Sequence, residues 1–193
     1  MTTGQFFFKY RSYTPLPLLI PLFLFGRPTP VTLIIGFIIS LIGEVIRFWG
    51  VSYAGSETRT TKVGASTLVT QGPFAYIRNP LYAGDMIIYF GISIMANSLF
   101  PFLQIAGLLY FYMQYYFIIK DEEDFLKNKF KEKYEDYYNS VNRLFPNFRK
   151  YHPEKQSKLK QDILAAYKSE KRTFQAMFLS MIMILLIYAL INN

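Results

Sequence analysis

Long stretches without a charged side chain constrain this chain more than any other feature of its sequence. Residues 173–193 and residues 12–26 contain no charged residue, and residues 79–119 contain only Asp85. A membrane-spanning helix needs about 20 consecutive and predominantly apolar residues. The hydrophobic fraction of 52% and the mean hydropathy of +0.17 agree with such segments. The sequence therefore predicts an all-α integral membrane protein.

We expect a single membrane-embedded domain that covers residues 1–193 and contains about five transmembrane helices. The expected spans are residues 14–26, 31–54, 80–97, 101–119 and 173–191. The first span is short and rich in proline, so it is predicted to be tilted or only partly inserted.

Basic side chains give this multi-pass protein an orientation. Of the 21 Lys and Arg residues, 14 lie between Lys120 and Arg172. The positive-inside rule then places the loops at 55–79 and 120–172 and the N-terminus in the cytoplasm, with the C-terminus outside. In a prokaryote this would be the inner membrane. Because acids are interleaved with the bases, contact with anionic lipids is favoured and no nucleic-acid partner is expected.

Several kinds of chemistry are disfavoured by composition. The chain has no cysteine, which excludes disulfides, thiol catalysis and cysteine-ligated metal. Its single histidine, His152, lies in a polar stretch and is expected to be solvated. Histidine-based metal sites and Ser–His catalysis are therefore not expected, and we predict no metal.

Residues 120–141 show the spacing of an amphipathic helix. Apolar side chains recur at steps of four, four, three and four residues: Leu126, Phe130, Tyr134, Tyr137 and Val141. Extended backwards, this face includes Glu122 and Ile118, whereas Glu123 points off it. A carboxylate on an apolar face needs a partner, so Glu122 is a candidate ligand-binding residue. Residues 150–172 are expected to form a solvated helix.

Two charged residues interrupt the span at 31–54. Glu44 and Arg47 are three residues apart on one helical face and can pair. One interpretation, which we favour, is an ion pair near the helix end. The other is a polar lining of a site, because charged groups at membrane depth usually face the protein interior. In that case both are candidate catalytic residues.

The polar loop before the third span carries several residues that set structure. Gly72-Pro73 indicates a turn. Asn79 is a candidate N-cap and Pro80 a candidate first helical residue. The N–H groups near residues 81–83 would then suit an anionic ligand group.

Three segments of this sequence stand in a familiar order and spacing: Thr67-Leu-Val-Thr-x-Gly, Arg78-Asn-Pro-x-Tyr-x-Gly84 and Asp121-Glu-Glu. The pattern resembles the isoprenylcysteine carboxyl methyltransferase family, together with related prokaryotic membrane methyltransferases and phospholipid N-methyltransferases. Gly43-Glu44-x-x-Arg47 also resembles that family. The resemblance covers about residues 40–148, so the final span lies outside it.

The resemblance implies a membrane enzyme that uses S-adenosylmethionine and has no soluble methyltransferase domain. It implies a pocket on the cytoplasmic side, closed by the amphipathic helix, and a substrate that enters from the bilayer. The methyl acceptor would be an isoprenylcysteine-like carboxylate or a lipid headgroup. Carried over by position, the cofactor-binding residues are Arg59, Ser66, Thr67, Leu68, Val69, Phe74, Asn79, Pro80, Leu81, Tyr82 and Glu122.

The sequence departs from that pattern at three positions. Eukaryotic members usually have His where this chain has Asn79, and tend to have Gln where it has Arg59. At the substrate-binding position, Ile118 stands where eukaryotic carboxyl methyltransferases have an Arg that holds the substrate carboxylate. An isoleucine cannot do this, so a prenylcysteine substrate does not follow from the resemblance.

Two other functions remain open. NAD(P)H-dependent membrane sterol or enone reductases have a similar Arg-x-Pro-Asn-Tyr segment, but here Leu81 precedes Tyr82, and the stretch at Thr67 favours the methyltransferases. A non-catalytic membrane scaffold would leave the orientation of Glu122 and the cap at Asn79 without a ligand.

Overall fold

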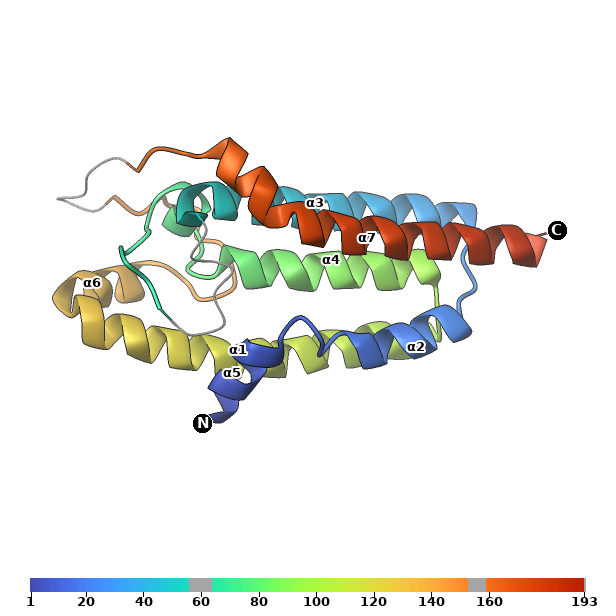
Figure 1. Ribbon diagram of the computed structural model, residues 1–193, viewed down its shortest axis with the longest axis horizontal. Helices are drawn as coiled ribbons and strands as arrows, with labels where there is room; N and C mark the ends of the chain where they lie inside the picture. Colours follow the sequence, from blue (N-terminus) through green and yellow to red (C-terminus); the bar gives the residue numbers. More distant parts are fainter. Residues whose placement is uncertain (56–63, 153–158, 193) are drawn as a thin grey trace.

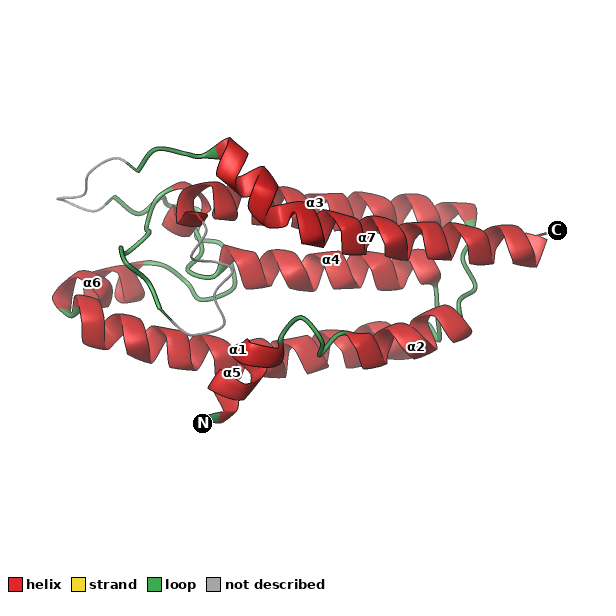
Figure 2. Cartoon of the chain, viewed as in Figure 1, coloured by secondary structure: helices red, strands yellow, loops and turns green. Residues whose placement is uncertain are grey.

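A computed structural model describes residues 1–55, 64–152 and 159–192, and this part of the chain contains helices and no strand (Figures 1 and 2). The α-helices are α1 (Thr3–Tyr10), α2 (Leu16–Leu24), α3 (Pro30–Ala54), α4 (Pro80–Ala96), α5 (Phe102–Phe130), α6 (Glu132–Ser140) and α7 (Ile163–Asn192). A short 3-10 helix, η2 (Gly72–Ala75), precedes α4. The predicted all-α fold is confirmed.

Within the part of the chain that the structure describes, three helices are long and apolar enough to cross a membrane, namely α3, α5 and α7. The apolar helix α4 has 17 residues and is slightly shorter. Helix α2 has nine residues, or about 14 Å, and a bilayer core is about 30 Å thick. The expected set of about five spans therefore contains three helices of full length. The segment at 14–26 is short, as predicted, and together with α1 it lies alongside α5 (Figure 1).

Helices α3 and α4 pack with their backbones in close contact because glycines face each other. A Cβ atom added to Gly43 would lie 2.7 Å from the carbonyl oxygen of Gly84. A Cβ atom added to Gly84 would lie 2.6 Å from the side chain of Arg47. Gly36, seven residues before Gly43, and Gly91, seven residues after Gly84, face each other in the same way. This packing places Arg47 of α3 directly against the start of α4.

The prediction of a single amphipathic helix at 120–141 is wrong, because two helices share this segment. Helix α5 continues to Phe130, Lys131 takes a positive φ of 49°, and α6 begins as a separate helix. The apolar spacing of α6 therefore does not extend through Lys131 into α5. As a result Glu123 is buried, at 4% exposure, and the prediction that it points off the buried face is wrong. Glu122 is half-buried.

The C-terminal region also differs from expectation. In place of a solvated helix at 150–172 and a separate span, α7 is one continuous helix from Ile163 to Asn192. Residues 150–152 and 159–162 are not helical. Helix α7 packs against α3 and α4 (Figure 1), and this contact carries Glu170 into the interior, where it is fully buried.

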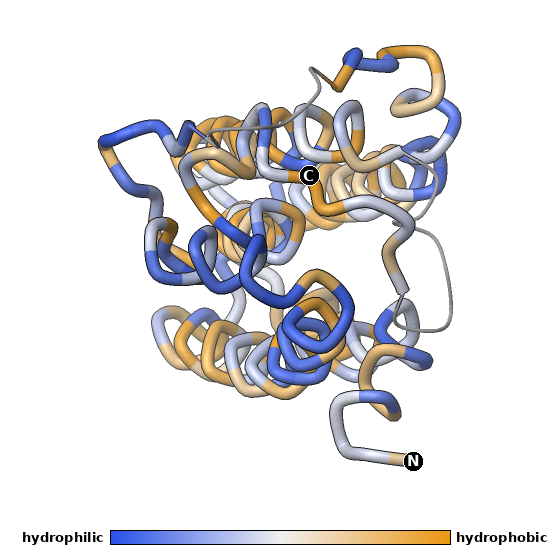
Figure 3. The backbone as a smooth tube through the Cα atoms, turned by 90° about the vertical axis from the view of Figure 1, so that its left-hand side faces the viewer, coloured by the Kyte–Doolittle hydropathy of each residue, from blue (hydrophilic) through white to orange (hydrophobic). Residues whose placement is uncertain are grey.

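One end of the bundle is polar. Figure 3 looks at the end where α6 projects, and hydrophilic segments are prominent there. The loop before α4, the C-terminal part of α5, and α6 all lie at this end (Figure 1). The predicted site residues that the structure describes in the loop before α4 therefore lie at the polar end of the bundle (Figure 1).

Candidate active site

The structure joins two predicted site residues that are 40 positions apart. The Tyr82 hydroxyl, on the first turn of α4, donates a hydrogen bond to Oε1 of Glu122 on α5 at 2.9 Å. The ring of Tyr82 packs against that of Tyr115, with centroids 4.7 Å apart. A tyrosine and a carboxylate from different helices thus meet beside the polar end of the bundle.

The start of α4 is where the sequence places it, but it is built differently. Asn79 is the N-cap residue and Pro80 is the first helical residue, as predicted. The Asn79 side chain makes no capping hydrogen bond. Its amide instead donates to the carbonyl oxygen of Arg143 at 3.1 Å. The first turn of α4 therefore presents its N–H groups without a side-chain cap.

The loop before α4 lies against α6. Of its predicted residues, two are exposed and three are partly buried: Ser66 and Thr67, and then Leu68, Val69 and Phe74. Leu68 packs on the buried cluster of Tyr134, Tyr137 and Val141. Burial raises the pKa of Tyr137, and its hydroxyl donates to the carbonyl oxygen of Phe74 at 2.7 Å.

The remaining predicted residues lie in different surroundings. Arg59 lies outside the described residues. Leu81 is partly buried, and its carbonyl oxygen is 3.5 Å from Nη1 of Arg47. Ile118 is fully buried in an apolar cluster against which Tyr82 packs, and its other buried members are Phe8, Phe111, Tyr115 and Ile119.

Glu123, to which the sequence assigned no role, binds two arginines. It accepts from Nε and Nη2 of Arg78 at 3.2 and 3.0 Å and from Nε of Arg143 at 3.3 Å, and Nη2 of Arg143 donates to its other oxygen. Burial alone would lower the pKa of Arg143, but the hydrogen bond and charge of Glu123 outweigh it and raise the pKa. The backbone amide of Arg78 also donates to the carbonyl of Asn142 at 2.8 Å. This ion cluster fixes the loop, α5 and the segment after α6 together.

Arg47 is the centre of a second polar group. Both Arg47 and Glu44 are buried, at 9% and 2% exposure, which agrees with the interpretation as a polar lining. The guanidinium of Arg47 binds Asp85 of α4 and Glu170 of α7. The prediction of a pair within one helix therefore missed these two partners. Asp85 could have been found as the lone charge in residues 79–119, whereas Glu170 lies in a stretch rich in other charges.

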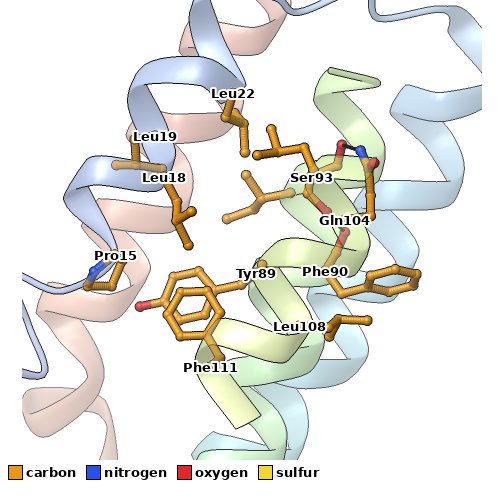
Figure 4. A pocket seen from close by; sticks show the side chains of 13 residues that line it. Pro15, Leu18, Leu19, Leu22, Tyr89, Phe90, Ser93, Gln104, Leu108 and Phe111 are labelled. Carbon is orange, nitrogen blue, oxygen red and sulfur yellow. Dashed lines mark hydrogen bonds between the residues drawn. The ribbon is translucent and has the colours of Figure 1, made fainter. Parts of the chain in front are cut away.

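A cavity of about 40 Å³ lies elsewhere in the bundle, between α2, α4 and α5 (Figure 4). Leucine and aromatic side chains form most of its wall, and the Gln104 amide donates to the Ser93 carbonyl oxygen at 2.9 Å. None of the predicted cofactor-binding residues lines it. A space of this size and character is far too small and too apolar for a nucleoside.

Comparison with known proteins extends these observations. A relative is the cobalt-zinc-cadmium resistance protein CzcN of Cupriavidus metallidurans, which is 29% identical over 126 residues. The match covers 65% of this chain and 54% of that protein, so the chain spans about half the length of this relative. No solved structure matches. Residues 31–133, more than half of the chain, match the model of the phospholipid methyltransferase family. The chain therefore belongs to the phospholipid methyltransferase family, and it is an integral membrane protein.

Proposed function

We propose that this protein transfers a methyl group from S-adenosylmethionine to a membrane-resident amphiphile. Membership of a methyltransferase family supports this reaction class. The observation that carries the proposal is the Tyr82–Glu122 hydrogen bond beside the start of α4. The catalytic unit would be one domain, with a core at about residues 40–148.

The residues present fit the charged groups of that cofactor. Glu122 offers a carboxylate to an ammonium group or to ribose hydroxyls. The first turn of α4 offers N–H groups to a carboxylate, because the Asn79 side chain is engaged with Arg143 and leaves them uncapped. The electron-rich face of Tyr82 suits a sulfonium cation. The site thus has an acceptor for the cationic end and donors for the anionic end.

The rest of the proposed binding shell is the loop before α4. Ser66, Thr67, Leu68, Val69 and Phe74 would line the pocket together with Arg59, Pro80 and Leu81. This loop is attached to α6 by the Tyr137–Phe74 hydrogen bond and to α5 by the Arg78–Glu123 pair. Helix α6 and the segment after it would therefore close the pocket. The positive-inside rule places this end in the cytoplasm.

When bound, S-adenosylmethionine supplies an electrophilic methyl group on sulfur. The contribution of the protein is then to hold the acceptor in line with that methyl group and to exclude water. An amine acceptor must also lose a proton before it attacks. Glu44 is our candidate for taking that proton, because it would offer a buried carboxylate on α3 beside the guanidinium of Arg47.

The acceptor site favours a lipid with an amine headgroup over a prenylcysteine carboxylate. Ile118 is fully buried among apolar side chains and cannot pair with a carboxylate. Three acidic side chains lie near the guanidinium of Arg47: Glu44, Asp85 and Glu170. Acidic side chains near an acceptor attract a cationic headgroup and repel an anionic one. The lipid would enter from the bilayer.

Ligand titration tests the proposal. Purified protein in detergent is titrated with S-adenosylmethionine, S-adenosylhomocysteine and NADPH while thermal stability is measured. A ligand at 100 times its Kd stabilises a protein by about 2.7 kcal/mol. We expect stabilisation by the two adenosyl ligands. Stabilisation by NADPH alone would indicate a reductase, and no stabilisation by any of the three would favour a scaffold.

Transfer of labelled methyl groups then identifies the acceptor. We expect label in vesicles that contain phosphatidylethanolamine and none in prenylcysteine analogues. Label in the prenylcysteine analogues would contradict the argument from Ile118.

A further inference from the structure

A continuous path of side-chain contacts, polar except for one contact between aromatic rings, connects the C-terminal helix to the proposed cofactor site. It begins at Glu170, which is fully buried on α7. The guanidinium of Arg47 on α3 donates to both oxygens of Glu170, with Nη2 at 3.1 and 3.0 Å and Nε at 3.2 Å. This arrangement engages two of the three nitrogens and fixes the plane of the guanidinium.

The third nitrogen continues the path into α4 and α5. Nη1 of Arg47 donates to Oδ1 of Asp85 at 2.5 Å. The other oxygen of Asp85 accepts from the Tyr115 hydroxyl at 3.2 Å. The Tyr115 ring packs against Tyr82, which hydrogen-bonds to Glu122. Four helices are thus linked by contacts in which each group has a defined orientation.

Packing alone does not explain an acidic residue at this place on α7. A buried ion pair usually stabilises a protein no more than apolar side chains of similar volume would. Helix α7 already has apolar contacts, since Met181 and Ile184 are buried in a cluster with residues of α2 and α4. The contacts of Glu170 balance the charge of Arg47 and fix its orientation, which apolar side chains at this position would not do.

The position of α7 in the sequence makes this contribution unexpected. The family match ends at residue 133, and α7 begins at Ile163. A site confined to the matched segment would contain Arg47 and Asp85 without their partner on α7.

We propose that Glu170 is a positioning residue of the methyl-transfer site, so that α7 is a working part of the enzyme. By holding Arg47, it keeps Nη1 on one oxygen of Asp85 and leaves the other oxygen for Tyr115. Tyr115 in turn holds the ring of Tyr82, whose hydroxyl faces Glu122. This inference rests on the proposed function, because the property that Glu170 tunes is the affinity for the cofactor.

The test compares Glu170→Gln with a control on the same helix. Glu170→Gln keeps the size of the side chain and removes its charge. Ile184→Ala removes packing of α7 at a fully buried site in a different cluster. Binding of S-adenosylhomocysteine is measured by calorimetry in detergent, and thermal unfolding is measured for each variant.

We expect Glu170→Gln to weaken binding about tenfold, which corresponds to about 1.4 kcal/mol. Tyr115→Phe, which removes only the hydroxyl, should weaken binding similarly, and the double variant should be little worse than either single one. Ile184→Ala should lower the melting temperature and leave the affinity unchanged. Unchanged affinity in Glu170→Gln, or an equal loss in Ile184→Ala, would overturn the proposal.

Two other outcomes also decide the question: a Glu170→Gln variant that does not fold, and a wild-type protein that does not bind the ligand. If Glu170→Gln does not fold, Tyr115→Phe and Ile184→Ala decide the question alone: the path fails if Tyr115→Phe binds normally or if Ile184→Ala loses equal affinity. If the wild-type protein does not bind S-adenosylhomocysteine, the proposed function has failed. The path itself is then tested by thermal unfolding, where additive effects of Glu170→Gln and Tyr115→Phe would contradict it.

Discussion

Arg78 and Glu123 are 45 residues apart in the sequence and are joined by two hydrogen bonds, at 3.2 Å from Nε and 3.0 Å from Nη2. Both side chains are buried, and Arg143 binds the same carboxylate. The pair connects the loop before α4 with α5. It therefore sets the position of the proposed binding loop relative to Glu122, the residue that precedes Glu123 on the same helix.

Replacing Glu123 should destabilise the protein strongly. Glu123→Gln leaves two arginines without their carboxylate, and breaking a buried ion pair in this way costs about 3–5 kcal/mol. The measurement is thermal unfolding in detergent. Asp124→Asn is the control, because Asp124 is the exposed neighbour on the same turn and should change stability by less than about 0.5 kcal/mol. Equal effects of the two substitutions would show that the Glu123 cluster is not structural.

Replacing Glu122 should reduce the affinity for the ligand more than the stability of the protein. Glu122 is half-buried, and its hydrogen bond is to Tyr82 alone among the contacts described above. We expect Glu122→Ala to weaken S-adenosylhomocysteine binding by about tenfold or more, because a hydrogen bond to a charged group contributes about 1.5–3 kcal/mol. Calorimetric titration measures this. Unchanged affinity would remove Glu122 from the cofactor site.

These two adjacent glutamates show what the sequence could predict. The charge-free stretches predicted membrane helices, and the helix bounds at 31–54 and 80–97 agree with α3 and α4 to within a residue. The role of Glu123 could not be predicted from apolar spacing, since Lys131 breaks the helix and the register of α6 does not apply to α5. A break of this kind depends on one backbone conformation and leaves no periodic signal.

Salt-bridge partners that lie far apart in the sequence also could not be predicted. The spacing of Glu44 and Arg47 indicated a pair within one helix, but the salt bridges of Arg47 described above are to Asp85 and Glu170 on other helices. Which of several charged residues enters the interior depends on how α7 packs on α3 and α4. The family resemblance, in contrast, named both Tyr82 and Glu122 as cofactor-binding residues, and the structure joins the two by a hydrogen bond.

The Asn79 side chain should act as a hydrogen-bond donor and not as a helix cap. A cap needs an acceptor atom, so Asp would replace Asn with little loss. The observed bond to the Arg143 carbonyl needs the amide N–H. We therefore expect Asn79→Asp to lower stability by about 1–3 kcal/mol, because it places a carboxylate against a carbonyl oxygen. Thermal unfolding measures the change, and a neutral or stabilising result would support the capping role instead.

The close contact of α3 and α4 predicts that a larger residue at Gly84 lowers both the stability of the protein and its affinity for the ligand. A methyl group on Gly84 would meet the side chain of Arg47 and the backbone of Gly43, so Gly84→Ala must separate the two helices or displace Arg47. Overpacking of this kind costs about 1–3 kcal/mol.

Gly107→Ala is the control, because nothing lies within 4 Å of a Cβ atom there and alanine stabilises a helix by about 0.5–1 kcal/mol relative to glycine. Thermal unfolding should therefore shift in opposite directions for the two variants. Because separating the helices or displacing Arg47 alters the position of Arg47 relative to Asp85 on α4, Gly84→Ala should weaken S-adenosylhomocysteine binding, whereas Gly107→Ala should not. Normal binding by Gly84→Ala despite its lower stability would separate the helix contact from the function of the site.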